Sequence, residues 1–142
     1  MKKSIIIALL WISCAACDQN KDEAPVAQKQ ITNFAYRQQK QVAISGQALN
    51  VNLLEVNESR CPKDVVCIQA GSVKLVLNIS DGTDEAKVSL SFKDNVKDTG
   101  TSTFILGKQR YSVTVHEVLP YPVSTTQTNL EDYKVGLSIE KI

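Results

Sequence analysis

The sequence of 142 residues has few of the side chains on which most active sites are built. It contains one histidine, one tryptophan and one methionine, and aromatic residues make up only 6% of it. A single histidine can serve only one general-base site. A nucleophile elbow, a glycine-rich phosphate loop and a His-x-x-x-His pair are all missing. The sequence therefore predicts a protein that is not an enzyme and that holds no cofactor.

An excess of charge of either sign is also missing. Lysine and arginine together number 16 against 15 acidic residues, and the signs are interleaved along the chain. A nucleic-acid-binding surface or a membrane-binding basic patch needs clustered positive charge. We therefore expect no nucleic-acid partner. The hydrophobic content of 43% is enough for a packed core, and the length fits one domain with a short appendage.

No apolar run is long enough to cross a bilayer, but a shorter apolar run lies near the start of the chain. Lys2 and Lys3 precede an apolar stretch over residues 4–12, which has the order of a signal peptide. Small residues then lead to Cys17, and this resembles the lipobox of bacterial lipoproteins, in which the cysteine becomes the acylated first residue. The sequence thus predicts a signal peptide over residues 1–16 and lipidation of Cys17. Ordinary secretion with cleavage after Ala16 is the alternative.

A polar stretch over residues 17–30 follows, without apolar periodicity, and predicts a flexible tether. Its Lys21-Asp22-Glu23 run resembles the export signal that sends Bacteroidota-type lipoproteins to the outer face of the outer membrane. A solvated linker would have the same composition. We expect a protein held on the outer membrane by its lipid, and the sequence leaves open whether it faces the periplasm or the cell surface.

Residues 31–142 read as an all-β domain, because apolar residues alternate and no segment has a helical period over a helical length. The Asp81-Gly82 pair predicts a hairpin turn. About seven short strands favour an antiparallel, immunoglobulin-like β-sandwich, with a small closed barrel as the alternative. The strands are expected over residues 41–45, 49–53, 73–79, 86–92, 104–106, 111–115 and 133–139.

Two glutamates interrupt this alternation. By parity, Glu55 and Glu117 would point into the core, and each is followed by a valine that would point out. A carboxylate that faces the core without a partner costs several kcal/mol. A β-bulge adds one residue to a strand and would turn each glutamate outward. We therefore predict bulges around residues 54–56 and 116–118.

Cys61 and Cys67 are the cysteines that remain once the signal peptide and the lipidated residue are set aside. An exported protein meets an oxidising compartment, so their spacing predicts a disulfide that closes a short loop. Gly71 permits a backbone turn into the next strand. A redox pair usually has two intervening residues rather than five. A metal site would need His116 as a further ligand, and parity places His116 on the solvent face.

The loop also carries a resemblance. Ser59-Arg60-Cys61-Pro62, followed after four residues by Cys67-Ile68-Gln69-Ala70-Gly71, is similar to the DSRCP…CxWAG signature of a family of small bacterial lipoproteins. Residues 119–122 and 133–137 resemble the C-terminal half of that family, so the likeness spans most of residues 40–142. Two positions depart from it, with Glu58 in place of aspartate and Gln69 in place of tryptophan. The resemblance implies the location and the fold, and no activity.

These observations predict a lipid-anchored binding or structural module of the cell envelope with an unknown protein partner. The candidate contact surfaces are the loops over residues 58–71 and 120–128, since rigid scaffolds present function on loops. Arg60, Gln69 and Tyr121 are the candidate binding residues, although Arg60 could instead pair internally with Glu58, Glu55 or Glu117. Two alternatives stay open: an exported inhibitor that inserts the loop into a hydrolase, and a metal-handling lipoprotein that uses Cys61, Cys67 and His116.

Overall fold

A computed structural model describes residues 30–94, 96–97 and 100–142 of the chain. The predicted signal peptide, the lipidation site Cys17 and nearly all of the predicted tether lie outside these residues. Within the described ranges no helix is long and apolar enough to span a membrane.

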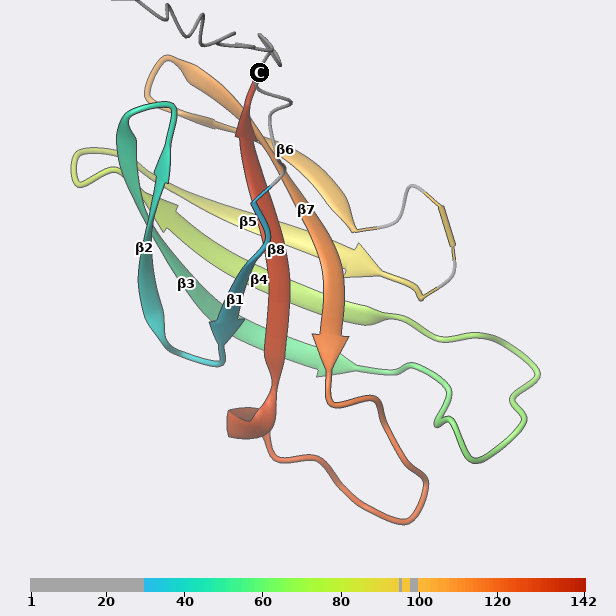
Figure 1. The fold of residues 1–142 in the computed structure, drawn as a ribbon. Helices are drawn as coiled ribbons and strands as arrows, with labels where there is room; N and C mark the ends of the chain where they lie inside the picture. Colours follow the sequence, from blue (N-terminus) through green and yellow to red (C-terminus); the bar gives the residue numbers. More distant parts are fainter. Residues whose placement is uncertain (1–29, 95, 98–99) are drawn as a thin grey trace, which may run out of the picture.

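The domain consists of two antiparallel four-stranded sheets that face each other (Figure 1). Sheet A has the order β1-β8-β7-β6 and sheet B the order β2-β3-β4-β5. The expected sandwich is therefore confirmed, with two separate sheets instead of one closed barrel. The strands are β1 (Thr32–Ala35), β2 (Gln39–Ile44), β3 (Gln47–Glu58), β4 (Val73–Ser80), β5 (Glu85–Phe92), β6 (Thr101–Leu106), β7 (Gln109–Leu119) and β8 (Lys134–Lys141), and the single-turn 3₁₀ helix η1 (Leu130–Asp132) precedes β8.

The order of the strands differs from that of an immunoglobulin domain. Consecutive strands of the chain are neighbours throughout sheet B and from β6 to β8 in sheet A, whereas immunoglobulin domains interleave their strands. The chain passes from one sheet to the other after β1 and after β5. At the first crossing Tyr36 donates its N–H to the carbonyl oxygen of Tyr133, just before β8 (3.3 Å), and Arg37 donates to that of Leu53 in sheet B (2.9 Å).

The core lies between the sheets and follows the alternation of the sequence. Leu49, Val51 and Leu53 of β3 are fully buried, and β4, β5 and β7 bury alternate residues in the same way. The central strand β8 is buried on both faces over residues 135–139. Full burial of an aliphatic side chain stabilises by about 1.5–3 kcal/mol. Between the sheets, Tyr111 stacks on Phe104 with 5.4 Å between ring centroids. The chain has one more strand than expected, which is β1. The sequence does not reveal this strand, because it has only four residues and its one buried residue, Phe34, provides no alternation.

Both predicted bulges are confirmed. The register of β3 against β4 shifts between Leu53 and Glu55, and that of β7 against β8 shifts between Val115 and Glu117. Each shift leaves its glutamate exposed. The following valines turn inward, since Val56 is 8% and Val118 is 1% exposed. The cost of an inward carboxylate is thus avoided by one extra residue in each strand.

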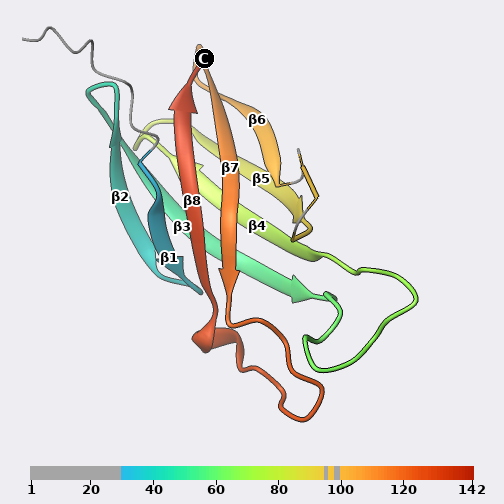
Figure 2. The same ribbon diagram turned by 45° about the vertical axis from the view of Figure 1, so that its right-hand side comes forward.

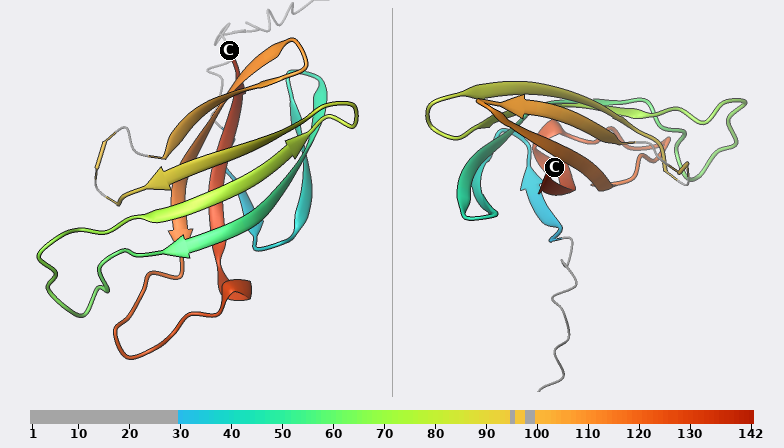
Figure 3. Two further views of the ribbon diagram at one scale, coloured as in Figure 1. Left: turned by 180° about the vertical axis from the view of Figure 1, so that it is seen from behind. Right: turned by 90° about the horizontal axis from the view of Figure 1, so that it is seen from above.

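Three loops lie at one end of the sandwich, which we call the loop end. These are the β3–β4 loop (59–72), the β5–β6 loop (93–100) and the β7–β8 loop (120–133). Ala35 pairs with Lys134 at this end and Thr32 pairs with Leu137 farther away, so β1 runs toward the loops. The described chain therefore starts at the opposite end, where the C-terminus also lies (Figure 2 and Figure 3, left).

Candidate binding surface at the loop end

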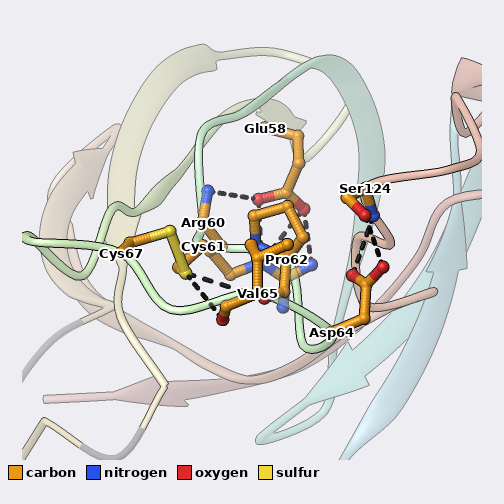
Figure 4. The surroundings of a disulfide bond; sticks show 8 residues. All are labelled: Glu58, Arg60, Cys61, Pro62, Asp64, Val65, Cys67 and Ser124. Carbon is orange, nitrogen blue, oxygen red and sulfur yellow. Dashed lines mark hydrogen bonds and ion pairs between the residues drawn. A yellow bond between two sulfur atoms is a disulfide. The ribbon is translucent and has the colours of Figure 1, made fainter.

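The β3–β4 loop contains the predicted disulfide. The sulfur atoms of Cys61 and Cys67 are 2.09 Å apart and the Cα atoms 5.9 Å apart. Figure 4 shows this bridge beside Arg60 and Glu58, at the point where the loop leaves β3. The bridge separates a base, formed by residues 58–61 and 70–72, from a protruding tip, residues 65–69, which we call the loop tip.

Arg60 lies inside the base of the loop. Its side chain is 2% exposed, and its guanidinium forms a double hydrogen bond with Glu58: Nε donates to Oε1 at 2.9 Å and the NH2 nitrogen donates to Oε2 at 2.5 Å. The Arg60 backbone N–H also donates to Glu58 Oε1 at 2.9 Å. The NH1 nitrogen reaches the β5–β6 loop, where it donates to Asp94 Oδ2 at 3.1 Å. One cation therefore joins two carboxylates from different loops.

The same guanidinium also holds the β7–β8 connection. It donates to Val118 O at 3.0 Å and to Pro120 O at 3.3 Å, and its Cζ lies 4.5 Å from the centroid of the Tyr121 ring. Arginine can make these contacts together because its planar fork carries five donors and stacks on aromatic rings. The internal pair with Glu58 is thus the arrangement that the structure adopts. With its side chain buried, Arg60 is not the partner-facing residue proposed from the sequence.

Burial and charge act in opposite directions on this cluster. Burial by itself lowers the pKa of Arg60, but hydrogen bonds and charge interactions with Glu58 and Asp94 outweigh it and leave that pKa raised. The arginine is therefore always charged. Burial, followed by the negative charge of Glu58, raises the pKa of the neighbouring Tyr133. The cluster holds its own counter-charges, so it does not require an external anion.

A second clamp joins the β3–β4 and β7–β8 loops. Asp64 accepts hydrogen bonds from the Ser124 backbone N–H at 2.8 Å and from the Ser124 hydroxyl, as Figure 4 shows. The backbone N–H of Lys63 donates to Pro122 O at 3.1 Å. The hydroxyl and then the backbone N–H of Ser124 lower the pKa of Asp64. Two loops that are about 60 residues apart in sequence are thereby held as one unit.

The return of the loop to β4 depends on Gly71. A Cβ at this position would lie 1.5 Å from the carbonyl oxygen of Ser59, so only glycine fits. Ser59 lies opposite Ser72, with its N–H donating to Ser72 O at 3.0 Å and its hydroxyl donating to the same oxygen at 2.5 Å. The base of the loop is therefore closed like a short hairpin.

The loop tip is apolar and exposed although its base is fixed. Val66 and Ile68 are fully exposed, at 101% and 103%, and Val65 is 44% exposed. Gln69 is exposed next to them. Tyr121, in contrast, is half-buried beneath Arg60. Of the three candidate binding residues from the sequence, Gln69 is therefore the one that lies at an open surface.

Sequence reasoning missed most of the residues that build this surface. Asp94, Asp64 and Ser124 come from three loops, and their partners are far away in sequence, so no local pattern could reveal them. Val66 and Ile68 carried a usable pattern. They are aliphatic residues in a segment that lies between Pro62 and Gly71 and is too short to form a strand. Outside a strand such residues have no alternation that would place them in the core, so their exposure could have been expected.

His116 and the cysteines do not come together. His116 is the extra residue of the β7 bulge, and it is half-buried with Nε2 2.8 Å from Ser138 Oγ. The sulfur atoms of Cys61 and Cys67 are bonded to each other, so neither is a thiolate ligand. Within the described part of the chain, no three or more histidine, cysteine or acidic residues are grouped so that they could hold a metal ion.

Comparison of the chain with protein-family models, with curated proteins and with solved structures finds no match in any of the three.

Proposed function

We propose that this protein is an exported, lipid-anchored binding module of the cell envelope that presents the loop tip to a protein partner. The observation that carries the proposal is the full exposure of Val66 and Ile68 on a loop whose base is fixed by a disulfide, by Arg60 and by the Asp64–Ser124 clamp. Single exposed apolar residues are ordinary on protein surfaces. Two fully exposed aliphatic residues that flank Cys67 on a braced loop offer an apolar surface to a partner.

The energetics favour this use. Valine and isoleucine have stiff side chains, and the braced loop leaves little backbone freedom to lose on binding. Each residue, buried in an apolar pocket of a partner, would contribute about 1.5–3 kcal/mol before the costs of association. Gln69 at the end of the loop tip and Lys63 next to it are both exposed and would supply a polar rim. The loop tip lacks an aromatic residue and its surroundings lack a cluster of one charge, which favours a protein pocket over a bilayer surface.

The anchor and the loop tip are compatible in space. The described chain begins at the end of the sandwich opposite the loops (Figure 1). A lipid on Cys17, followed by a tether, would therefore let the loop tip point away from the membrane. The resemblance to small envelope lipoproteins supports the same location.

Site-specific photo-cross-linking in intact cells tests the proposal. A photoreactive residue replaces Gln69, and cross-linked products are identified in an otherwise wild-type chain and in a Val66→Ser/Ile68→Ser chain. We expect a discrete protein adduct that the double substitution abolishes. Ile105→Ser is the matched control, because Ile105 is 60% exposed on β6 and should not affect the adduct. An adduct that is unchanged by the double substitution would contradict the proposal.

A second candidate function is inhibition of a hydrolase. The braced, protruding loop favours it, because preorganised loops insert into clefts at low entropic cost. The test is an inhibition assay against envelope proteases and lysozyme-type enzymes with the intact and the reduced protein. Inhibition that is lost on reduction supports this candidate, and the absence of inhibition under both conditions removes it.

A further inference from the structure

A groove of about 470 Å³ opens between β1 and β2, where the two sheets separate. Figure 3 (right) shows these strands diverging when the molecule is viewed from above. The groove lies away from the loop tip, because Val42 and Ile44 pair with Leu49 and Gln47 at the start of β3, whereas the loop tip follows the end of that strand. Its volume lies within the range of about 300–1,000 Å³ that is common for ligand sites.

The wall formed by β2 is aliphatic and incompletely covered. Val42 and Ile44 face the core, as the alternation requires, but both are only half-buried. In the adjacent strand Leu49 and Val51 face the same way and are fully buried. Val42 and Ile44 are less covered because β1, which faces β2 across the groove, has only four residues. The opposite wall is formed by the core residues Phe34, Leu137 and Ile139.

Lys40 places a positive charge at this groove. Its Nζ donates to the carbonyl oxygen of Asn33 at 3.2 Å and lies 5.9 Å from the centroid of the Phe34 ring. An ammonium group has three donors, so this contact leaves two for another acceptor. Among the described residues that line the groove, Lys40 is the one charged side chain, and none is acidic. The groove therefore combines one cation with a half-covered aliphatic wall.

We propose that this groove binds a single-chain anionic amphiphile, such as a long-chain carboxylate. The anionic head accepts hydrogen bonds from the Lys40 ammonium, and the aliphatic chain covers Val42 and Ile44. A charged head gains a charge-assisted contact, while the chain removes apolar surface from water. A cationic head is repelled by the lysine, and a neutral head can accept its hydrogen bonds but forms no ion pair with it. The inference is independent of the function proposed for the loop tip.

The test is titration of the full-length chain with dodecanoate below its micellar concentration, followed by methyl NMR and calorimetry. We expect saturable binding with shifts of the Val42, Ile44 and Ile139 methyl signals and none at Val66 or Ile68. Site-resolved shifts also separate the groove from any association with the apolar N-terminal run. Dodecyltrimethylammonium keeps the chain but reverses the head charge, and we expect it to bind about tenfold more weakly or not at all.

Lys40→Met removes the charge and keeps the aliphatic stem. We expect about a tenfold weaker affinity for dodecanoate and no change for dodecyl maltoside, which has a neutral head. Lys87 is at an exposed position on β5. Lys87→Met is therefore the matched control, and this variant should bind dodecanoate like the wild type. The proposal is overturned by equal affinity for the two charged amphiphiles, by unchanged affinity of Lys40→Met, or by shifts elsewhere. Groove signals that move with protein concentration alone would also overturn it, since a second copy would then be the occupant.

Discussion

Arg60 shows how the same residue can look like a contact site in the sequence and be a structural residue in the fold. An arginine in a stapled loop is a reasonable anchor for a partner's carboxylate. In the structure its five donors are directed to Glu58, Asp94 and the carbonyls of Val118 and Pro120. A buried ion pair of this kind adds less stability than its contacts suggest, because both charges are desolvated. Its value here is that it fixes three loops relative to one another.

Replacing Arg60 tests this role. Arg60→Met leaves Glu58 and Asp94 without their cation, and we expect the free energy of unfolding to fall by about 3 kcal/mol, the lower end of the range for broken buried pairs. The lower end applies because the Glu58 and Asp94 side chains are still 15% and 27% exposed. Urea denaturation measures the change. Arg110→Met, at an exposed position on β7, should change stability by less than about 0.5 kcal/mol, and equal effects of the two substitutions would refute the role.

The Asp64–Ser124 clamp predicts a pH dependence. The hydrogen bonds from Ser124 lower the pKa of Asp64 below its ordinary value of 3.8. A carboxylate with a lowered folded-state pKa stabilises the fold above its unfolded pKa and loses that effect as the pH falls through the folded-state pKa. We expect the Ser124 amide NMR signal to titrate with a midpoint below 3.8. A midpoint at or above that value would show that the clamp does not form in solution.

The strands show how a local irregularity preserves a global pattern. Glu117 and Val118 would have the wrong orientations in an unbroken β7, and the bulge at His116 exchanges them. Because Val118 is 1% exposed and Glu117 lies outside, the two residues should respond oppositely to truncation. We expect Val118→Ala to cost about 2 kcal/mol and Glu117→Ala less than about 0.5 kcal/mol in thermal or urea unfolding. The reverse order would mean that the strand is regular.

The stapled loop is the second element that can be tested alone. Cys61→Ala/Cys67→Ala removes the constraint on the unfolded chain, and the entropy of such a short loop predicts a loss of about 2–3 kcal/mol. Denaturation of the double variant measures this loss, with reduced wild-type protein as the comparison. Since Arg60 and Gly71 lie at the base of the loop, we expect the base to persist and the loop tip to exchange its amides faster. Unchanged exchange at the loop tip would show that the disulfide does not hold it.

At the scale of the whole molecule, stability and binding are assigned to different regions. The core between the sheets contains the buried apolar residues, whereas Val66 and Ile68 project from one end and contact no core residue at full exposure. We therefore expect Val66→Ser/Ile68→Ser to leave the free energy of unfolding within about 0.5 kcal/mol of wild type. Calorimetry of both proteins provides the measurement. A larger loss would place the tip in the folded core and weaken the proposed function.

The strands from β2 to β8 could be predicted because alternation of apolar residues is a local property with a period of two. The same rule located both bulges, through the misplaced Glu55 and Glu117. It failed at β1, whose four residues bury Phe34 alone and pair with the last strand of the chain. It could not give the meander order of the sheets either, since pairing depends on which edges meet in space.

The sequence by itself determined the all-β class, the turns, the bulges and the cysteine pair, because each follows from residue type and spacing along a short segment. Only the tertiary structure decided that Arg60 is internal, that Asp94 and Ser124 complete the loop end, and that Val42, Ile44 and Lys40 line a groove. These features join residues that are distant in the chain. Their energies depend on burial and on partner geometry, and neither exists until the sheets have packed.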